Sequence, residues 1–277
     1  DQMCYFWAKC KEKGIYIQYC LLGVRYPSTE MNHPAYEDLS IGFKTEIYFD
    51  PQLQEMTKEL EKTILTWENP YTGTTLANDP CVAMYEINNE SNLINTFGSY
   101  SGDNYEIKSE YEKNLFRSLF NEYLKKIYGT NDKLVQAWTA EGKTALRDGE
   151  NLDNGTVTLV EQYQKSGFSE QRVNDSFAFL YQLQSKYHTE MIQWLKTEIG
   201  VKAPVTGTTN LPTNDRADIY ENAQYDYLAR HQYQSHPQSG TEYKVGAYTG
   251  NVDSVILNPA GTALAEDAAR RVTGRPY

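Results

Sequence analysis

The sequence lacks the features that would assign it to several common classes. It has few cysteines for its 277 residues, and they form no CxxC pair and no Cys/His spacing suited to zinc. They are Cys4, Cys10, Cys20 and Cys81. No run of 18 apolar residues occurs, so no segment resembles a transmembrane helix. No GxSxG motif and no glycine-rich phosphate loop follows an expected strand, which argues against a serine hydrolase and a nucleotide-binding enzyme.

The charge balance limits the kinds of partner. The chain has 26 Lys and Arg against 37 Asp and Glu, which gives a net charge of −11 at pH 7. Nucleic acids and anionic membranes would be repelled by this charge, so we expect neither as a partner. An uncharged substrate would be neither attracted nor repelled by this net charge.

Tyrosine is abundant, with 23 Tyr beside 9 Phe and 4 Trp. A tyrosine offers an apolar face and a polar tip, which suits the mixed surface of a sugar ring. The same property suits half-buried positions on helix faces, and composition alone favours that structural interpretation.

Apolar runs of strand length alternate with segments that repeat apolar residues every three or four positions. The run IYIQYCLL at 15–22 is nearly continuous in apolar residues, as in a strand that is covered on both faces. Asp50-Pro51 predicts the start of a helix, and Gly200 predicts the end of one. We expect strands at 15–22, 82–87, 201–206 and 225–233, and helices before residue 14 and at 51–67, 108–127, 132–138, 169–198 and 262–272.

Successive strand–helix units without an antiparallel pattern predict an α/β fold with a parallel sheet. The sheet can be open and doubly wound or closed into a barrel. Two long irregular segments, 23–49 and 139–168, interrupt the alternation. Long ordered loops are commonly functional, and we interpret 139–168 as a loop insertion in a single domain.

Glu90 is the best candidate for a catalytic residue. It follows the apolar strand at 82–87, within the polar cluster Asn88 to Asn92. A carboxyl group at the end of a buried strand, beside amides rather than cations, can serve as a general acid. The alternative is that the cluster merely caps a turn.

The stretch NPYTGTTLANDPCVAMYEINNESNL (69–93) resembles the fourth-strand region of clan A glycoside hydrolases, especially cellulase-like members of family five. Three other stretches resemble the third, fifth and sixth strands of that family in the same order, and a fourth resembles the approach to the seventh. They are GIYIQYCLLGVRYP (14–27), VKAPVTGTTN (201–210), DYLARHQYQSHP (226–237) and RRVTGRPY (270–277).

The resemblance implies a (β/α)8 TIM barrel, covered from about strand 3 to the start of strand 7. On this alignment residues 1–277 form one catalytic-barrel domain that is truncated at both ends. Asn89 and Glu90 match the family's Asn-Glu pair, in which the glutamate is the acid/base. His231 and Tyr233 match its His-x-Tyr on strand six, and Arg25 matches a strand-three arginine. The nucleophilic glutamate is expected beyond residue 277.

The resemblance therefore implies a retaining glycoside hydrolase that acts on a β-linked glycan or glycoside by double displacement, with a carbohydrate as its partner and no cofactor or metal. The alternative is a truncated or degenerate barrel that binds carbohydrate without cleaving it. A polysaccharide substrate would favour an extracellular location, and the sequence leaves the compartment otherwise open.

Overall fold

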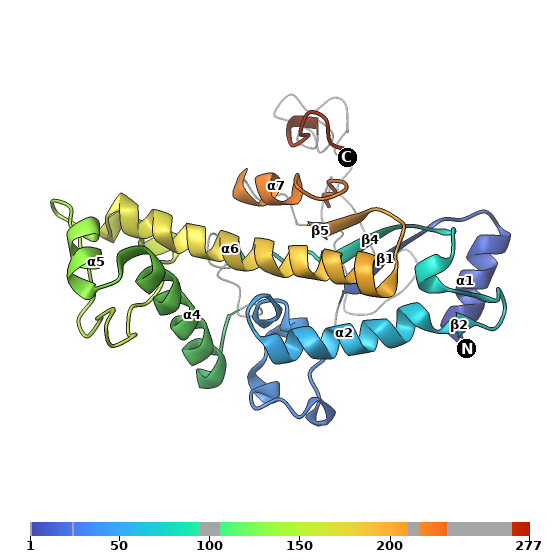
Figure 1. The fold of residues 1–277 in the computed structure, drawn as a ribbon, viewed down its shortest axis with the longest axis horizontal. Coiled ribbons are helices and arrows are strands. Elements are labelled where there is room, and N and C mark those ends of the chain that lie inside the picture. Colours follow the sequence, from blue (N-terminus) through green and yellow to red (C-terminus); the bar gives the residue numbers. More distant parts are fainter. Residues whose placement is uncertain (1, 24, 95–105, 210–215, 232–267) are drawn as a thin grey trace, which may run out of the picture.

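The computed structural model describes residues 2–23, 25–94, 106–209, 216–231 and 268–277. Its longest helix, α6, runs along the long axis of the molecule (Figure 1), with α4 and α5 at one end and α1 at the other. No helix in these ranges combines the length and the apolar character needed to cross a bilayer.

The centre of the fold is a parallel sheet in the order β1-β4-β5. The strands are β1 (Ile17–Leu22), β4 (Val82–Asn89) and β5 (Val205–Thr209). Every residue of β5 is buried, as are most of those in the central strand β4. This burial explains why β4 begins as an apolar run rather than as an alternating pattern. The residues of β5, VTGTT, are buried as well, although most of them are small and polar. The three predicted strands at 15–22, 82–87 and 201–206 are thereby confirmed, with ends shifted by a few residues.

The predicted helices in the first 200 residues are present. They are α1 (Gln2–Glu12), α2 (Pro51–Thr66), α4 (Glu110–Tyr128), α5 (Asn131–Trp138) and α6 (Glu170–Trp194), which continues into a π-helical turn (Leu195–Ile199). Asp50 caps α2 by accepting hydrogen bonds from the amides of Gln52 and Leu53. Gly200 ends the π-helical turn with a left-handed φ of 84°.

Smaller elements complete the chain. A two-stranded antiparallel ladder joins β2 (Glu68–Asn69) to β3 (Thr74–Thr75), and α7 (Arg216–Asn222) follows β5. Short 3-10 turns lie at Thr29–Met31, Tyr36–Asp38, Ile41–Phe43, Glu46–Tyr48, Leu76–Asn78 and Gln162–Gly167.

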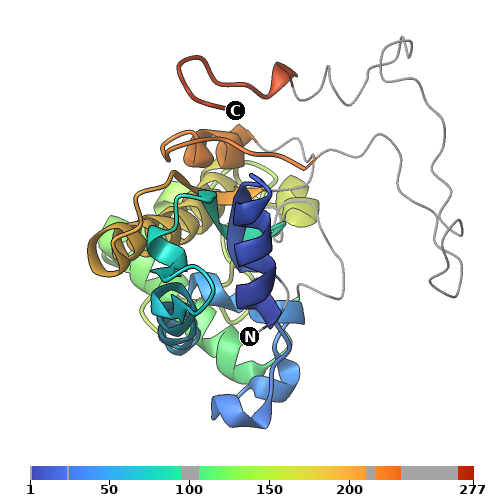
Figure 2. The ribbon, with the colours of Figure 1, turned by 90° about the vertical axis from the view of Figure 1, so that its right-hand side faces the viewer.

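Helices α2 and α6 run side by side (Figures 1 and 2). The buried face of α6 contributes Tyr187, Met191 and Trp194 to one continuous hydrophobic core, which also contains Tyr85 of β4 and Val205 of β5. Burial of such large side chains contributes about 1.5–3 kcal/mol each, so this packing fixes the sheet against α6.

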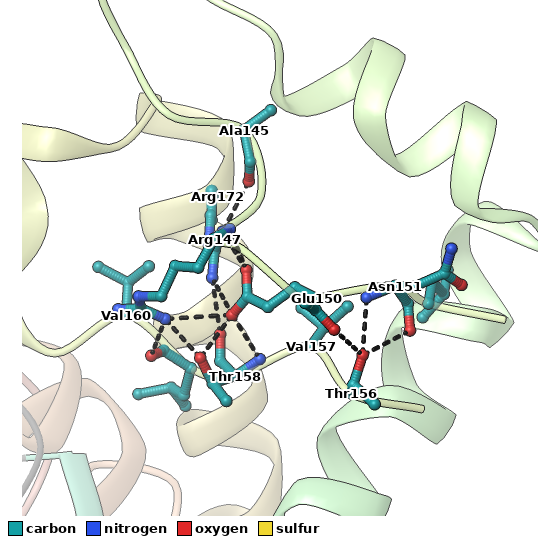
Figure 3. Close-up of polar contacts among 12 residues, drawn as sticks. Ala145, Arg147, Glu150, Asn151, Thr156, Val157, Thr158, Val160 and Arg172 are labelled. Atoms are coloured by element: carbon teal, nitrogen blue, oxygen red, sulfur yellow. Dashed lines mark hydrogen bonds and ion pairs between the residues drawn. The ribbon is translucent and has the colours of Figure 1, made fainter. Parts of the chain in front are cut away.

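The segment 139–168 is irregular but tightly held. Figure 3 shows Glu150 between Arg172 of α6 and Thr158 of the segment itself. Arg172 also donates to the carbonyl oxygens of Ala145 and Thr158, at 2.6 and 3.0 Å. The segment is thereby fastened to α6, and its origin as an insertion in a barrel stays a prediction.

The structure corrects one predicted element. Residues 225–231 form no strand, although Asp226 N donates to Val205 O and Val205 N donates to the Asp226 carboxylate. Because the Asp226 side chain takes one of these bonds, the segment lies along β5 without forming a regular ladder. Residues 232–233 of this predicted strand, and the helix predicted at 262–272 up to residue 267, lie outside the described residues.

The structure thus shows an α/β fold with a parallel sheet. Three described strands do not establish a closed barrel, so the (β/α)8 barrel stays a prediction.

Candidate active site

The candidate site lies at the carboxyl edge of the sheet. Leu22 pairs with Asn88, and Asn89 pairs with Thr209, so the three strands end next to one another. Glu90 follows directly after β4, the central strand. Its backbone is left-handed, with φ of 49°, which is uncommon for a residue other than glycine.

Glu90 and His231 lie together at this edge. The Glu90 Oε1 atom is 2.6 Å from His231 Nδ1, across 141 residues of sequence. The side chains of His231 and Glu90 are 37% and 23% exposed, so both are accessible to a ligand. A carboxyl group that is held by a titratable neighbour and open to solvent suits general acid/base chemistry.

The other residues named from the sequence differ in their surroundings. Asn89 is partly exposed, and its amide makes no hydrogen bond with the described part of the chain, while its backbone carbonyl accepts from Lys44 Nζ at 2.6 Å. Tyr233 lies outside the described residues.

Arg25 is engaged away from Glu90. Its guanidinium forms an ion pair with Glu61 of α2 and donates to Leu21 O at 2.8 Å. Glu61 is fully buried, and it also accepts a hydrogen bond from Tyr19 at 2.8 Å. Burial raises the pKa of Glu61, and the charge of Arg25 opposes that shift. In this structure Arg25 therefore neutralises a buried carboxylate and is not brought to the Glu90–His231 pair.

Glu86 is a site residue that the sequence reasoning missed. It is 2% exposed and accepts hydrogen bonds from Thr209 N at 3.2 Å, from the Thr209 hydroxyl and from Gln18 Nε2 at 3.1 Å. Burial raises the pKa of Glu86, while the Thr209 hydrogen bond and the charge of His231 lower it. A carboxylate inside an otherwise apolar strand was the signal that could have found it.

The described residues contain one cluster with the composition of a metal site, formed by His33, Asp50 and Glu112. His33 Nε2 lies 3.0 Å from Asp50 Oδ2 and 3.4 Å from Glu112 Oε1, and all three side chains are fully buried. However, His33 Nδ1 accepts a hydrogen bond from Ala35 N at 3.1 Å, so Nε2 carries the proton of the neutral ring. A histidine that binds a metal through Nε2 normally donates from Nδ1.

The cluster therefore suits a proton better than a metal ion. Burial and then the charge of Asp50 raise the pKa of Glu112 to about 9, which keeps Glu112 neutral at physiological pH. The cluster joins His33 of the long segment 23–49 and Asp50, the N-cap of α2, to Glu112 of α4.

Comparison with known proteins gave no matching family model and no matching curated protein. Among solved structures, a β-galactosidase from the psychrophilic Marinomonas ef1 aligns with a TM-score of 0.51 and 15% identity, over 81% of this chain and 32% of its own. An agarase aligns at 0.46 and 15%, over 80% and 29%. An endo-β-1,4-mannanase from Thermotoga petrophila aligns at 0.29 and 15%, over 91% and 56%.

The likeness to the β-galactosidase, with a TM-score above 0.5, is a likeness of fold. This chain spans about a third of the length of that enzyme.

Proposed function

We propose that this chain carries the acid/base part of the active site of a retaining glycoside hydrolase. The observation that carries the proposal is the Glu90–His231 pair at the carboxyl end of the central strand, with 2.6 Å between Oε1 and Nδ1. The carboxyl ends of parallel strands are where α/β barrels keep catalytic residues. The fold shared with a β-galactosidase supports the same assignment.

On this proposal Glu90 acts twice. It first protonates the oxygen of the departing sugar or aglycone, and it later removes a proton from the water that releases the glycosyl group from the enzyme. His231 contacts one carboxyl oxygen of Glu90 and thereby orients the group, so that the other oxygen can meet the glycosidic oxygen.

The remaining roles follow the resemblance. The nucleophile is a second carboxylate, expected beyond residue 277 and about 5–5.5 Å from Glu90, as a retaining mechanism requires. The Asn89 amide is assigned to the 2-hydroxyl of the sugar, and Tyr233 to the adjoining pocket. The substrate class is a β-linked glycan or glycoside, and no cofactor takes part.

The test is the substitution Glu90→Gln in the longest form of the protein that cleaves β-glycosides. A glutamine cannot donate a proton to the leaving oxygen, so cleavage of substrates with poor leaving groups should fall by about 10²–10⁴-fold. Activated aryl glycosides should keep their first step. Glu110→Gln is the matched control, because Glu110 is exposed on α4 and, within the described residues, forms an ion pair only with the surface residue Lys113.

Equal loss on both kinds of substrate, or no loss on either, would contradict the assignment of Glu90. The chain of 277 residues should be assayed in parallel against the same panel of glycans. If it binds glycans and no form of the protein cleaves them, the alternative of a degenerate barrel that only binds carbohydrate replaces the proposal.

A further inference from the structure

The backbone at Glu90 needs support, because a non-glycine residue with φ of 49° is held there only by its surroundings. Two peptide planes meet at the Cα atom of Glu90. The first contains the carbonyl of Asn89, and the second contains the amide of Ser91. Whatever fixes these two planes fixes the direction in which the Glu90 side chain leaves the strand.

The first plane is held by Lys44. Its ammonium group donates to Asn89 O at 2.6 Å. The second plane is held by β5, because Ser91 N donates to the hydroxyl of Thr208 at 3.4 Å. Lys44 also takes part on this side, since its own carbonyl accepts a hydrogen bond from Ser91 Oγ at 2.7 Å. One residue of a distant loop therefore contacts the chain on both sides of Glu90.

The loop is built to bring Lys44 inward. The two residues before it, Gly42 and Phe43, both have left-handed backbones, with φ of 66° and 42°. Tyr48 anchors the same loop by donating to Ser91 O at 2.7 Å. The turn at Gly42 and Phe43, together with this anchor, places Lys44 under the end of β4.

Lys44 itself is unusual, because it is only 5% exposed. Burial lowers the pKa of Lys44, and Glu90, followed by Cys20 and Glu86, opposes that shift. A buried ammonium is costly unless it is paired or hydrogen-bonded. A methionine or a leucine would fill the same space without that cost, which points to a role for the charge and the hydrogen bond.

We propose that Lys44 is a positioning residue for Glu90: its ammonium group holds the peptide plane before Glu90 and directs the carboxyl group toward His231. This inference rests on the proposed acid/base role of Glu90. Lys44 does not contact the substrate in this proposal and acts only through Glu90.

The experiment compares Lys44→Met, Lys44→Gln and Lys44→Arg in the same protein as Glu90→Gln. Lys44→Met should lower kcat for substrates with poor leaving groups by about 10–100-fold, because an acid misplaced by about 1 Å transfers its proton poorly. KM should stay nearly unchanged. Loss of the neighbouring positive charge should also move the alkaline limb of the kcat/KM profile to higher pH. Lys44→Arg should keep the original limb, and Lys44→Gln should follow Lys44→Met.

Lys196→Met is the matched control. Lys196 Nζ also donates to a backbone carbonyl at 2.6 Å, that of Ala203, but it does so before β5, at the opposite end of the sheet. The Lys196→Met variant should be less stable than the parent protein but should keep the parent's pH profile of kcat/KM. If Lys44→Met lowers kcat equally for activated and poor leaving groups and keeps the parent profile, Lys44 is merely structural and the proposal is overturned.

A crystal structure of the Lys44→Met chain gives a readout that needs no activity. The proposal requires that Glu90 leave the left-handed region or lose its contact with His231. Retention of both features would overturn it. If Glu90→Gln leaves activity unchanged, the proposed function fails, whereas an effect of Glu90→Gln without any effect of Lys44→Met means that only the positioning role fails.

Discussion

The buried ion pair between Glu150 and Arg172 should contribute measurably to the free energy of unfolding. Arg172 is fully buried, and its two terminal nitrogens each lie 2.9 Å from a different oxygen of Glu150. Its guanidinium also lies over the rings of Trp138 and Phe168, at 4.8 and 4.5 Å from their centroids. Replacing Glu150 by Gln leaves this cation buried without its counter-charge.

The magnitude can be derived from the pKa of Glu150. Burial alone would raise that pKa, but hydrogen bonds from Arg172 and Thr158 outweigh burial and lower it from 4.5 to about 2. At about 1.36 kcal/mol for each pH unit by which the pKa falls, this lowering corresponds to roughly 3 kcal/mol. The Glu150 side chain is only 4% exposed, so solvent screening removes little of this energy. Breaking a buried pair typically costs about 3–5 kcal/mol, which agrees with this value.

The sign of the pH dependence follows from the direction of the shift. The folded pKa of Glu150 lies below the unfolded value, so the stabilisation is complete above about pH 4.5 and is lost as the pH falls toward 2. Urea unfolding should show Glu150→Gln to be less stable than the parent by about 3 kcal/mol at pH 7, with a difference that shrinks on acidification.

The control for this experiment is Glu110→Gln, which removes an exposed carboxylate that pairs with Lys113 at 3.0 Å. It should change the free energy of unfolding by less than about 0.5 kcal/mol. A difference below about 1 kcal/mol for Glu150→Gln at pH 7, or one that is constant between pH 7 and pH 3, would refute the reasoning about the buried pair.

Two further predictions concern stability. The folded pKa of Glu112 is about 9, so the parent protein loses stability as the pH rises from about 4.5 to 9. The Glu112→Gln variant has no carboxyl group to ionise there, so its stability relative to the parent should rise with pH, by about 3 kcal/mol at pH 7. Equal pH dependence of urea unfolding in the two proteins would contradict this. Gly207→Ala should destabilise the chain by about 1–3 kcal/mol, since a Cβ there would lie 2.6 Å from His188 Nδ1 and 2.9 Å from Asn222 Oδ1; an unchanged melting temperature would show that these side chains can move aside.

Much of the sheet and the helices could be predicted because their signals are local. The Asp50-Pro51 start of α2 and the Gly200 end of the helical region depend on the conformation of a few consecutive residues. The apolar runs of β1 and β4 are local as well. The segment 225–231 shows the limit of this reasoning, because its apolar and aromatic residues suit a strand while the Asp226 side chain takes one of the bonds of a ladder.

For the candidate site, the sequence identified Glu90, Asn89 and His231 because the stretches that contain them resemble strands of one enzyme family in the same order. The Glu90–His231 contact itself joins residues 141 positions apart, and its distance and exposure came from the fold. Arg25 was named as well, but its partner Glu61 lies on a different element, and no spacing in the sequence relates the two.

The sequence by itself determined the order of the main strands and helices up to residue 209 and the polar end of the central strand, since each follows from residue types within a short window. Its composition determined the negative net charge. Tertiary structure decided which groups meet. The contact of Lys44 with Asn89 spans 45 residues and depends on two left-handed residues in an irregular loop. The energy of such contacts comes from burial and exclusion of water, which are properties of the packed chain and not of any local segment.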